Sequence, residues 1–187
     1  MSIKSQLLDS SVLKARIAES MIPKISRMCT VILASLKKGN KVMFCGNGGS
    51  AGDAQHLAGE FINQFRFPRA PLPGLALTTD SSVLTCIGND SSFDHVFSKQ
   101  VKALGKKGDV LIAISTSGNS KNIIEACRAA KEKGIYIIGL TGETGGNMKG
   151  IVNCLINVPS TDTPRIQEAH ITIGHIICLL VEKELFG

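Results

Sequence analysis

Two short segments rich in glycine and hydroxyl groups carry residues that suit anion chemistry. The first, Asn47-Gly48-Gly49-Ser50, follows an apolar run and leads directly into a helical pattern. The second, residues 115–120, holds four hydroxyl groups, on Ser115, Thr116, Ser117 and Ser120. Glycines allow positive φ, and a helix N-terminus presents unpaired N–H groups with partial positive charge. Both segments therefore predict binding of an anion such as phosphate.

Each segment also has a plainer interpretation as the start of a helix. The first can be a tight turn with Ser50 as its N-cap, and the second can be a capping segment. One hydroxyl is enough for a cap, so the three surplus hydroxyls of the second segment favour phosphate binding. The first segment matches neither GxGxxG nor GxxxxGK[ST], which disfavours a dinucleotide or nucleoside triphosphate site.

Acid/base side chains lie on two helical segments. His56 and Glu60 are four residues apart and lie within roughly 40° of each other on one face. Gln167 and His175 are separated by about 12 Å of helix and roughly 80°, so they meet one ligand only at full reach or belong to separate sites shared with a neighbouring subunit. Taken alone, the first pair fits a solvated contact and His175 fits a core histidine. The same helix also carries Glu168 and His170.

The elements that must position these residues alternate along the chain. Five short apolar runs predict strands buried on both faces, and intervening helical patterns predict an α/β fold. We expect a doubly wound, five-stranded parallel sheet, in which the two anion segments end neighbouring strands at a switch point. The predicted strands are 41–45, 74–78, 110–115, 135–141 and 154–159, and the predicted helices between them are 50–65, 93–104 and 120–133.

Additional helices are predicted at both ends of the chain. Residues 7–38 have helical character with Pro23 as a break into two helices, and residues 163–185 form one long C-terminal helix. The proline-rich stretch 64–73 is predicted to be a connecting loop. We therefore expect a single domain over residues 1–187 with an N-terminal helical extension of about residues 1–38.

Composition narrows the function classes. The 187 residues are 43% hydrophobic and 19% charged, which is enough apolar material for a packed core. The longest apolar runs are far shorter than the roughly 20 residues of a membrane span, and the N-terminus lacks the apolar segment of a secretory signal. We expect no membrane association and a cytoplasmic location.

Charge and cysteine usage support the same expectation. The net charge of +6 is scattered, and with no Trp and one Tyr the chain offers no stacking platform for nucleic acid. The six cysteines are at least 16 residues apart and form no CxxC pair. We expect buried, reduced thiols and no nucleic-acid partner.

Five segments in order resemble the SIS (sugar isomerase) domain family and, within it, the sedoheptulose-7-phosphate isomerases, also called phosphoheptose isomerases. They are CGNGGSAGDAQHLAGEF at 45–61, LTTDSSVLTCIGND at 77–90, ISTSGNSKNI at 114–123, LTGETGGNM at 140–148 and VPSTDTPRIQEAHITIGHIIC at 158–178. The resemblance implies a flavodoxin-like SIS fold. It also implies interconversion of sedoheptulose 7-phosphate and D-glycero-D-manno-heptose 7-phosphate, the first step towards heptose for lipopolysaccharide or capsule.

The resemblance also assigns roles to residues. Glu60 is expected to be the base and His175 its acid/base partner. One Zn²⁺ per subunit is expected at His56, Glu60, Gln167 and His175, and the chain is expected to form a homotetramer with sites at subunit boundaries. Substrate contacts are expected at Asn47, Gly48, Gly49, Ser50, Asn89, Asp90, Ser115, Thr116, Ser117, Ser120 and Gln167. Asp80 and Asp90, in the predicted loop after the second strand, are either sugar ligands or helix caps.

One departure and two rival functions remain open. Gln64 stands where many family members have an arginine that approaches the substrate, and Arg66 and Arg69 are candidate substitutes. One rival is a non-enzymatic SIS protein that binds the replication initiator DnaA, but such proteins lose the acid/base residues that this chain keeps. The other is an isomerase of another phosphosugar, such as arabinose 5-phosphate, a class that usually carries further domains.

Overall fold

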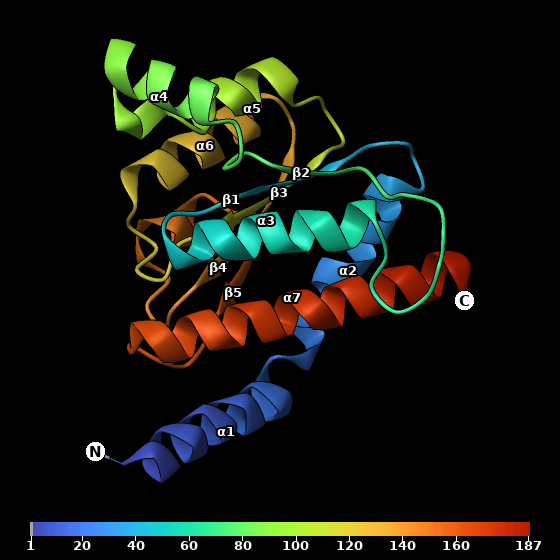
Figure 1. The fold of residues 1–187 in the computed structure, drawn as a ribbon, viewed down its shortest axis with the longest axis vertical. Helices are drawn as coiled ribbons and strands as arrows, with labels where there is room; N and C mark the ends of the chain where they lie inside the picture. Colours follow the sequence, from blue (N-terminus) through green and yellow to red (C-terminus); the bar gives the residue numbers. More distant parts are fainter. Residues whose placement is uncertain (1) are drawn as a thin grey trace.

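The predicted parallel sheet is present in the computed structural model, which describes residues 2–187 (Figure 1). Its five strands lie in the order β2-β1-β3-β4-β5, and every neighbouring pair is parallel. Each strand falls within its predicted run: β1 Val42–Cys45, β2 Gly74–Ala76, β3 Val110–Ile114, β4 Tyr136–Thr141 and β5 Cys154–Asn157. The order reverses between β1 and β3, so the expected doubly wound topology is confirmed.

Helices cover both faces of this sheet because alternate side chains of each strand point to opposite faces. Phe44 and Ile112 pack into one core with α2 (Ile22–Leu36), α3 (Gly49–Ile62) and α7 (Thr163–Phe186). Met43 and Leu111 pack into a second core with α5 (Ser98–Leu104) and α6 (Lys121–Glu132). Burial on both faces explains why these strands are uninterrupted apolar runs in the sequence.

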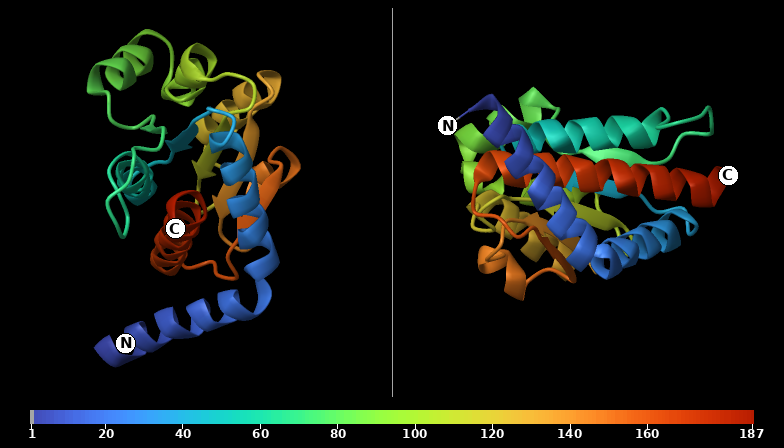
Figure 2. Two further views of the ribbon diagram at one scale, coloured as in Figure 1. Left: turned by 90° about the vertical axis from the view of Figure 1, so that its right-hand side faces the viewer. Right: turned by 90° about the horizontal axis from the view of Figure 1, so that it is seen from below.

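The N-terminal extension consists of two helices, α1 (Ile3–Ser20) and α2. The break between them falls at Met21, and Pro23 lies in the first turn of α2, where its missing N–H leaves no bond unmade. The prediction of a break at Pro23 was therefore two residues late. Helix α1 projects away from the sheet, as the left view of Figure 2 shows.

One helix was missed entirely. Residues 81–90 form α4 (Ser81–Asp90), although this stretch was predicted to be a loop. None of its side chains is fully buried, and its apolar stripe is short, since Leu84 and Ile87 pack only partly buried against the second core. Asp80 is its N-cap, because Asp80 Oδ1 accepts a hydrogen bond from the Val83 N–H at 2.9 Å. Asp90 is the last residue of the helix and not a loop residue.

Smaller differences concern two short 3₁₀ turns. The predicted helix 93–104 is divided into a 3₁₀ turn, η1 (Phe93–His95), and α5. A second 3₁₀ turn, η2 (Gly146–Gly150), lies between β4 and β5. The first turn thus lies in the connection between α4 and α5, and the second in the connection between two neighbouring strands.

All six cysteines are unbonded; five are buried as expected, but Cys86 on α4 is exposed, which corrects that part of the prediction. In the described part of the chain, no helix is both long and apolar enough to span a bilayer.

The arrangement that matters for chemistry is the pairing of α3 with α7. The two helices lie side by side and run in the same direction across one face of the sheet (Figure 1). A Cβ atom on Gly49, at the start of α3, would lie 2.6 Å from Gln167 Nε2 near the start of α7. Helix α3 begins at the glycine turn after β1, so this pairing carries α7 to the switch point of the sheet.

Candidate active site

Three ionisable side chains meet where α3 and α7 touch. His56 Nε2 lies 2.8 Å from His175 Nε2 and 3.3 Å from Glu60 Oε1. The two imidazole rings meet edge to face, with centroids 5.0 Å apart. In a hydrogen bond between two ring nitrogens, one nitrogen donates and the other accepts. The proton between His56 Nε2 and His175 Nε2 is therefore bound to only one of them at a time. The structure thus brings together Glu60, His175 and His56, three of the residues singled out in the sequence.

The surroundings of His175 favour its neutral form. Burial lowers the pKa of His175 below its ordinary value, and the neighbouring His56 lowers it further, while Glu60 acts in the opposite direction. A neutral imidazole can accept a proton at one nitrogen and donate from the other, which suits a residue that moves protons between oxygen atoms.

An aromatic ring forms one side of this cluster. The Phe65 ring lies against His175, with centroids 5.5 Å apart and planes tilted by 35°. The Arg66 guanidinium carbon lies 5.5 Å from the Phe65 ring centre on an exposed side chain. Arg69, in contrast, is buried in an ion pair with Glu182. Of the two candidate substitutes for an arginine at position 64, only Arg66 is free to approach a ligand.

Asp53 is a further carboxyl group on α3 that sequence reasoning did not assign. Burial raises its pKa to about 6, an effect that His56 partly opposes. Its Oδ2 atom is buried and has no hydrogen-bond partner within residues 2–187. It lies one turn before His56, and its polarity alone gave no signal that would separate it from an ordinary surface aspartate.

The two anion segments are held together at the switch point. Asn47 and Asn122 form two reciprocal amide hydrogen bonds of 2.9 Å, which join the glycine turn after β1 to the first turn of α6. Ser115 and Ser120 Oγ atoms are 3.0 Å apart within the loop after β3. Because β1 and β3 are neighbours, the prediction that these segments end adjacent strands is confirmed.

Neither segment caps its helix through a serine side chain, so the predicted Ser50 cap and the capping box are both wrong. Gly48, with φ of +55°, is the N-cap of α3, and Ser50 lies inside the helix. Ser120 occupies the N-cap position of α6, but its side chain makes no capping hydrogen bond and contacts Ser115 instead. The side chains of Ser50 and Ser120 therefore cap neither helix, whereas Ser117 Oγ accepts a hydrogen bond from the Asn119 N–H at 3.1 Å.

A polar cavity of about 270 Å³ adjoins the second segment. It lies where the loops after β3, β4 and β5 come together, and hydroxyl and amide groups line it, among them Thr116, Ser117, Asn119, Thr144, Ser160 and Thr161. Thr144, Ser160 and Thr161 were not predicted as site residues. They come from two other loops, and only the three-dimensional arrangement of strand ends places them beside Thr116.

The remaining predicted residues lie apart from the histidine pair. Asn89 and Asp90 are exposed at the end of α4, where Asn89 Nδ2 donates to Asp90 Oδ1 at 2.7 Å. No hydrogen bond described for residues 2–187 links either residue to His56, Glu60 or His175. Gln167 lies against Gly49, at the anion end of α3. In this chain Gln167 is therefore placed with the glycine turn and not with the other proposed zinc ligands.

Comparisons with known proteins agree with this architecture. Residues 9–142 match the SIS domain family. The phosphoheptose isomerase of Rhodospirillum rubrum is 58% identical over 163 residues, which are 87% of each chain. Phosphoheptose isomerase 2 of Campylobacter jejuni is 53% identical over 99% of this chain and 93% of its own length.

Solved structures give the same result. The phosphoheptose isomerase GmhA from Neisseria gonorrhoeae superimposes with a TM-score of 0.92 at 43% identity, covering 97% of each chain. A phosphoheptose isomerase from Francisella tularensis superimposes with a TM-score of 0.94 at 37% identity, covering 97% of this chain and 96% of its own.

The chain has a doubly wound sheet with hydroxyl-rich loops at its switch point, and the family model matches most of its length. It therefore belongs to the SIS domain family. Its high identity to relatives along nearly the whole sequence then narrows the assignment. The chain belongs to the phosphoheptose isomerases, which are aldose–ketose isomerases.

Proposed function

We propose that this chain interconverts sedoheptulose 7-phosphate and D-glycero-D-manno-heptose 7-phosphate, with Glu60 and His175 as its acid/base pair. The observation that carries the proposal is the convergence of these two side chains on His56 Nε2, from two different helices. The product would enter heptose synthesis for lipopolysaccharide or capsule. Reduced thiols and a phosphosugar substrate both fit a cytoplasmic enzyme.

The reaction moves one carbon-bound and one oxygen-bound proton. From the ketose, Glu60 removes a proton from C1 while His175 donates a proton to the C2 oxygen, which gives an ene-diol. Glu60 then returns a proton to C2, and His175 accepts the proton of the C1 hydroxyl as the aldehyde forms. Both residues end in their starting protonation states, so the pair serves both directions.

The spacing along α3 suits a long phosphosugar. Ser50 and Glu60 are ten residues apart, which is about 15 Å of helix. A glutamate side chain on a helix points back towards the N-terminus and shortens that span. An extended seven-carbon sugar phosphate covers roughly 10 Å, at about 1.3 Å per bond along the chain. We therefore place the phosphate at the loops of Ser50 and Ser115–Ser120 and the reacting carbons at Glu60.

We also propose one Zn²⁺ per subunit at His56, Glu60, His175 and Gln167. Two imidazoles and a carboxylate are a donor set that zinc prefers. Neighbouring ligands of tetrahedral zinc are about 3.3 Å apart for bonds of 2.0–2.1 Å, so the 3.3 Å between His56 and Glu60 fits. For both histidines to bind one zinc ion, the 2.8 Å between their Nε2 atoms must widen by about 0.5 Å. Accordingly, residues 2–187 contain no group of three or more His, Cys, Asp or Glu side chains already arranged to hold a metal ion.

Gln167 would join such a site only by turning away from Gly49. When bound, zinc would polarise the carbonyl and hydroxyl oxygens of the sugar and stabilise negative charge in the ene-diol. The metal content of the purified protein, measured by mass spectrometry, tests this part. We expect near-stoichiometric zinc that falls in His56→Ala, and equal metal in both proteins would remove the proposed ligand set.

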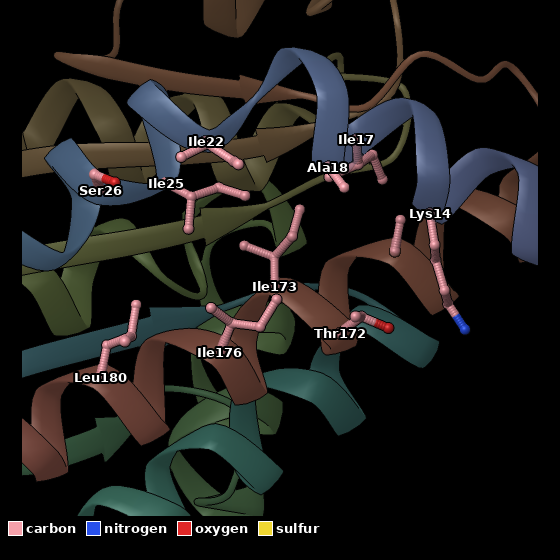
Figure 3. Close-up of a pocket in the computed structure, with 11 residues that line it drawn as sticks. Lys14, Ile17, Ala18, Ile22, Ile25, Ser26, Thr172, Ile173, Ile176 and Leu180 are labelled. Atoms are coloured by element: carbon pink, nitrogen blue, oxygen red, sulfur yellow. The ribbon is translucent and has the colours of Figure 1, made fainter.

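A homotetramer is the third part of the proposal. An apolar groove of about 240 Å³ lies between α1, α2 and α7, with Ile17, Ile22, Ile25, Ile173, Ile176 and Leu180 among its lining residues (Figure 3). Helix α1 also exposes Ile3, Leu7, Leu8 and Val12. Apolar surface of this extent on a projecting helix favours burial against further copies of the chain. Light scattering tests it: we expect a tetramer that dissociates in Leu7→Gln with Val12→Gln, and a monomeric wild type would overturn it.

Product analysis by NMR tests the activity itself. Wild-type protein should convert sedoheptulose 7-phosphate to the heptose 7-phosphate, and Glu60→Gln should lower turnover by about 100- to 10,000-fold with its fold unchanged. Glu132→Gln, an exposed glutamate on α6, is the matched control and should keep wild-type turnover. Full turnover in Glu60→Gln would remove Glu60 as the base, and an inactive wild type would remove the proposed substrate.

A further inference from the structure

A buried ion pair joins the C-terminal half of α7 to the loop that follows α3. Arg69 Nε donates to Glu182 Oε1 at 3.1 Å, and the two side chains are only 3% and 1% exposed. Removing two charges from water costs several kcal/mol each, and well-packed apolar residues often stabilise a fold as well as such a pair. Stability alone therefore does not account for this pair, and its other contacts point to a role in geometry.

The backbone contacts of Arg69 define the first part of that role. Arg69 Nη2 donates to the Glu60 carbonyl oxygen at 2.7 Å, and Nη1 donates to the Phe61 carbonyl oxygen at 2.7 Å. These carbonyls lie in the last turn of α3, where a helix leaves carbonyl groups without an internal partner. Arg69 thus holds the end of α3 at the residue that carries the proposed base.

The backbone contacts of Glu182 define the second part. Glu182 Oε1 accepts from the Phe65 N–H at 2.8 Å, and Oε2 accepts from the Arg66 N–H at 2.7 Å. Those bonds fix the position of Phe65, whose ring lies against His175. Glu182 and His175 are seven residues apart, so they project from α7 within about 20° of each other. The Glu182 carboxylate therefore holds Phe65 against His175 on the same side of α7.

From these contacts we propose that Arg69 and Glu182 are positioning residues that set the approach of Glu60 to His175, and that Phe65 holds the His175 ring. The inference rests on the proposed isomerase function for its catalytic consequence. The structural part of the inference does not depend on the substrate. It says that the Arg69–Glu182 pair joins the end of α3 to α7 and holds the Phe65 ring against the His175 imidazole.

The test uses Glu182→Gln, which keeps the size of the side chain but replaces one accepting oxygen with an NH₂ group. One of the two amides, of Phe65 or Arg66, then loses its acceptor. We expect kcat to fall by about 10- to 100-fold while KM for sedoheptulose 7-phosphate stays within about twofold, since the phosphate loops lie at the other end of α3. Glu184→Gln is the matched control, because Glu184 is exposed on the same helix; it should match the wild type.

Two more variants separate positioning from simple stability. The double variant Arg69→Met with Glu182→Leu should fold, because an apolar pair replaces a buried ion pair. Its kcat should nevertheless be lowered, as in Glu182→Gln. Phe65→Ala should lower kcat, and Phe65→Tyr, which keeps the ring, should restore it. Wild-type kcat in the folded double variant, or equal rates for Phe65→Ala and Phe65→Tyr, would overturn the proposal.

A readout independent of turnover distinguishes this inference from the proposed function. The ring resonances of His175 report its surroundings by NMR in the absence of substrate. They should shift in Glu182→Gln and Phe65→Ala and stay in place in Glu184→Gln. Unshifted His175 resonances in Glu182→Gln and Phe65→Ala would contradict the positioning role, even if the enzyme is fully active. If the wild-type protein does not convert sedoheptulose 7-phosphate but the resonances shift in these variants, the positioning role holds and only the proposed substrate is wrong.

Discussion

Gly174 of α7 faces Leu57 of α3 with no room for a side chain between them. A Cβ atom on Gly174 would lie 2.6 Å from Leu57 Cδ2. The residue that follows Gly174 is His175, which lies 2.8 Å from His56 across the same contact. The missing side chain thus allows the two helices to approach closely enough for their imidazoles to meet.

Gly174→Ala should therefore damage both stability and catalysis. The added methyl group must displace Leu57 or separate the helices, which should lower the free energy of unfolding by about 1–3 kcal/mol. The displaced His175 should lower kcat by about tenfold or more. Chemical denaturation and initial rates measure the two effects, and a variant with wild-type values of both would contradict this reading of the contact.

Gly52→Ala is the matched substitution on α3 and should behave in the opposite way. A Cβ at this exposed position would have nothing within 4 Å, and Gly52 does not adopt a positive φ. Alanine is favoured over glycine in a helix interior by about 1 kcal/mol, so the unfolding free energy should rise by up to that amount with kcat unchanged. Lower stability in this variant would show that a neighbour occupies the space beside Gly52.

Asn122→Asp should weaken substrate binding without slowing the chemical step. The aspartate keeps an acceptor for Asn47 but loses the donor of the reciprocal pair, and it adds a negative charge beside the proposed phosphate site. We expect KM to rise by about five- to tenfold with kcat within about twofold. Steady-state kinetics decide the point: a fall in kcat with unchanged KM would place Asn122 in the chemistry and not in the anion loops.

Much of this fold was predictable because its signals are local. Strands such as β3 are continuous apolar runs, and the glycine turn before α3 is marked by its own residues. Helix α4 was missed because its apolar stripe is short, with Leu84 and Ile87 only partly buried against the second core. The contact between His56 and His175 spans 119 residues, and no spacing rule reports which faces of two distant helices meet.

For the same reason, individual members of the predicted site could not be grouped by spacing alone. Gln167 and His175 share α7, yet Gln167 lies at the anion end of α3 and His175 at the acid/base end. The Arg69–Glu182 pair and the reciprocal bonds of Asn122 were invisible in the sequence, since single charged and amide residues carry no sign of their partners.

The buried His170 should make stability depend on pH. Its ring is fully buried with Nε2 3.1 Å from the Thr141 carbonyl oxygen, and burial lowers its pKa from 6.5 to about 4. The unfolded chain therefore binds this proton more readily than the folded protein. The resulting stability is fully present above pH 6.5 and is lost as the pH falls towards 4, by up to about 3 kcal/mol.

Asp53 acts with the opposite sign. Its pKa is raised from 3.8 to about 6, so in that interval the folded protein binds the proton more readily, and stability from this group falls as the pH rises. Denaturation of metal-free protein between pH 4 and 7 should therefore show a flatter dependence in His170→Gln and a steeper one in Asp53→Asn than in the wild type. Because the two variants must change the slope in opposite directions, parallel curves for all three proteins would contradict both assignments together.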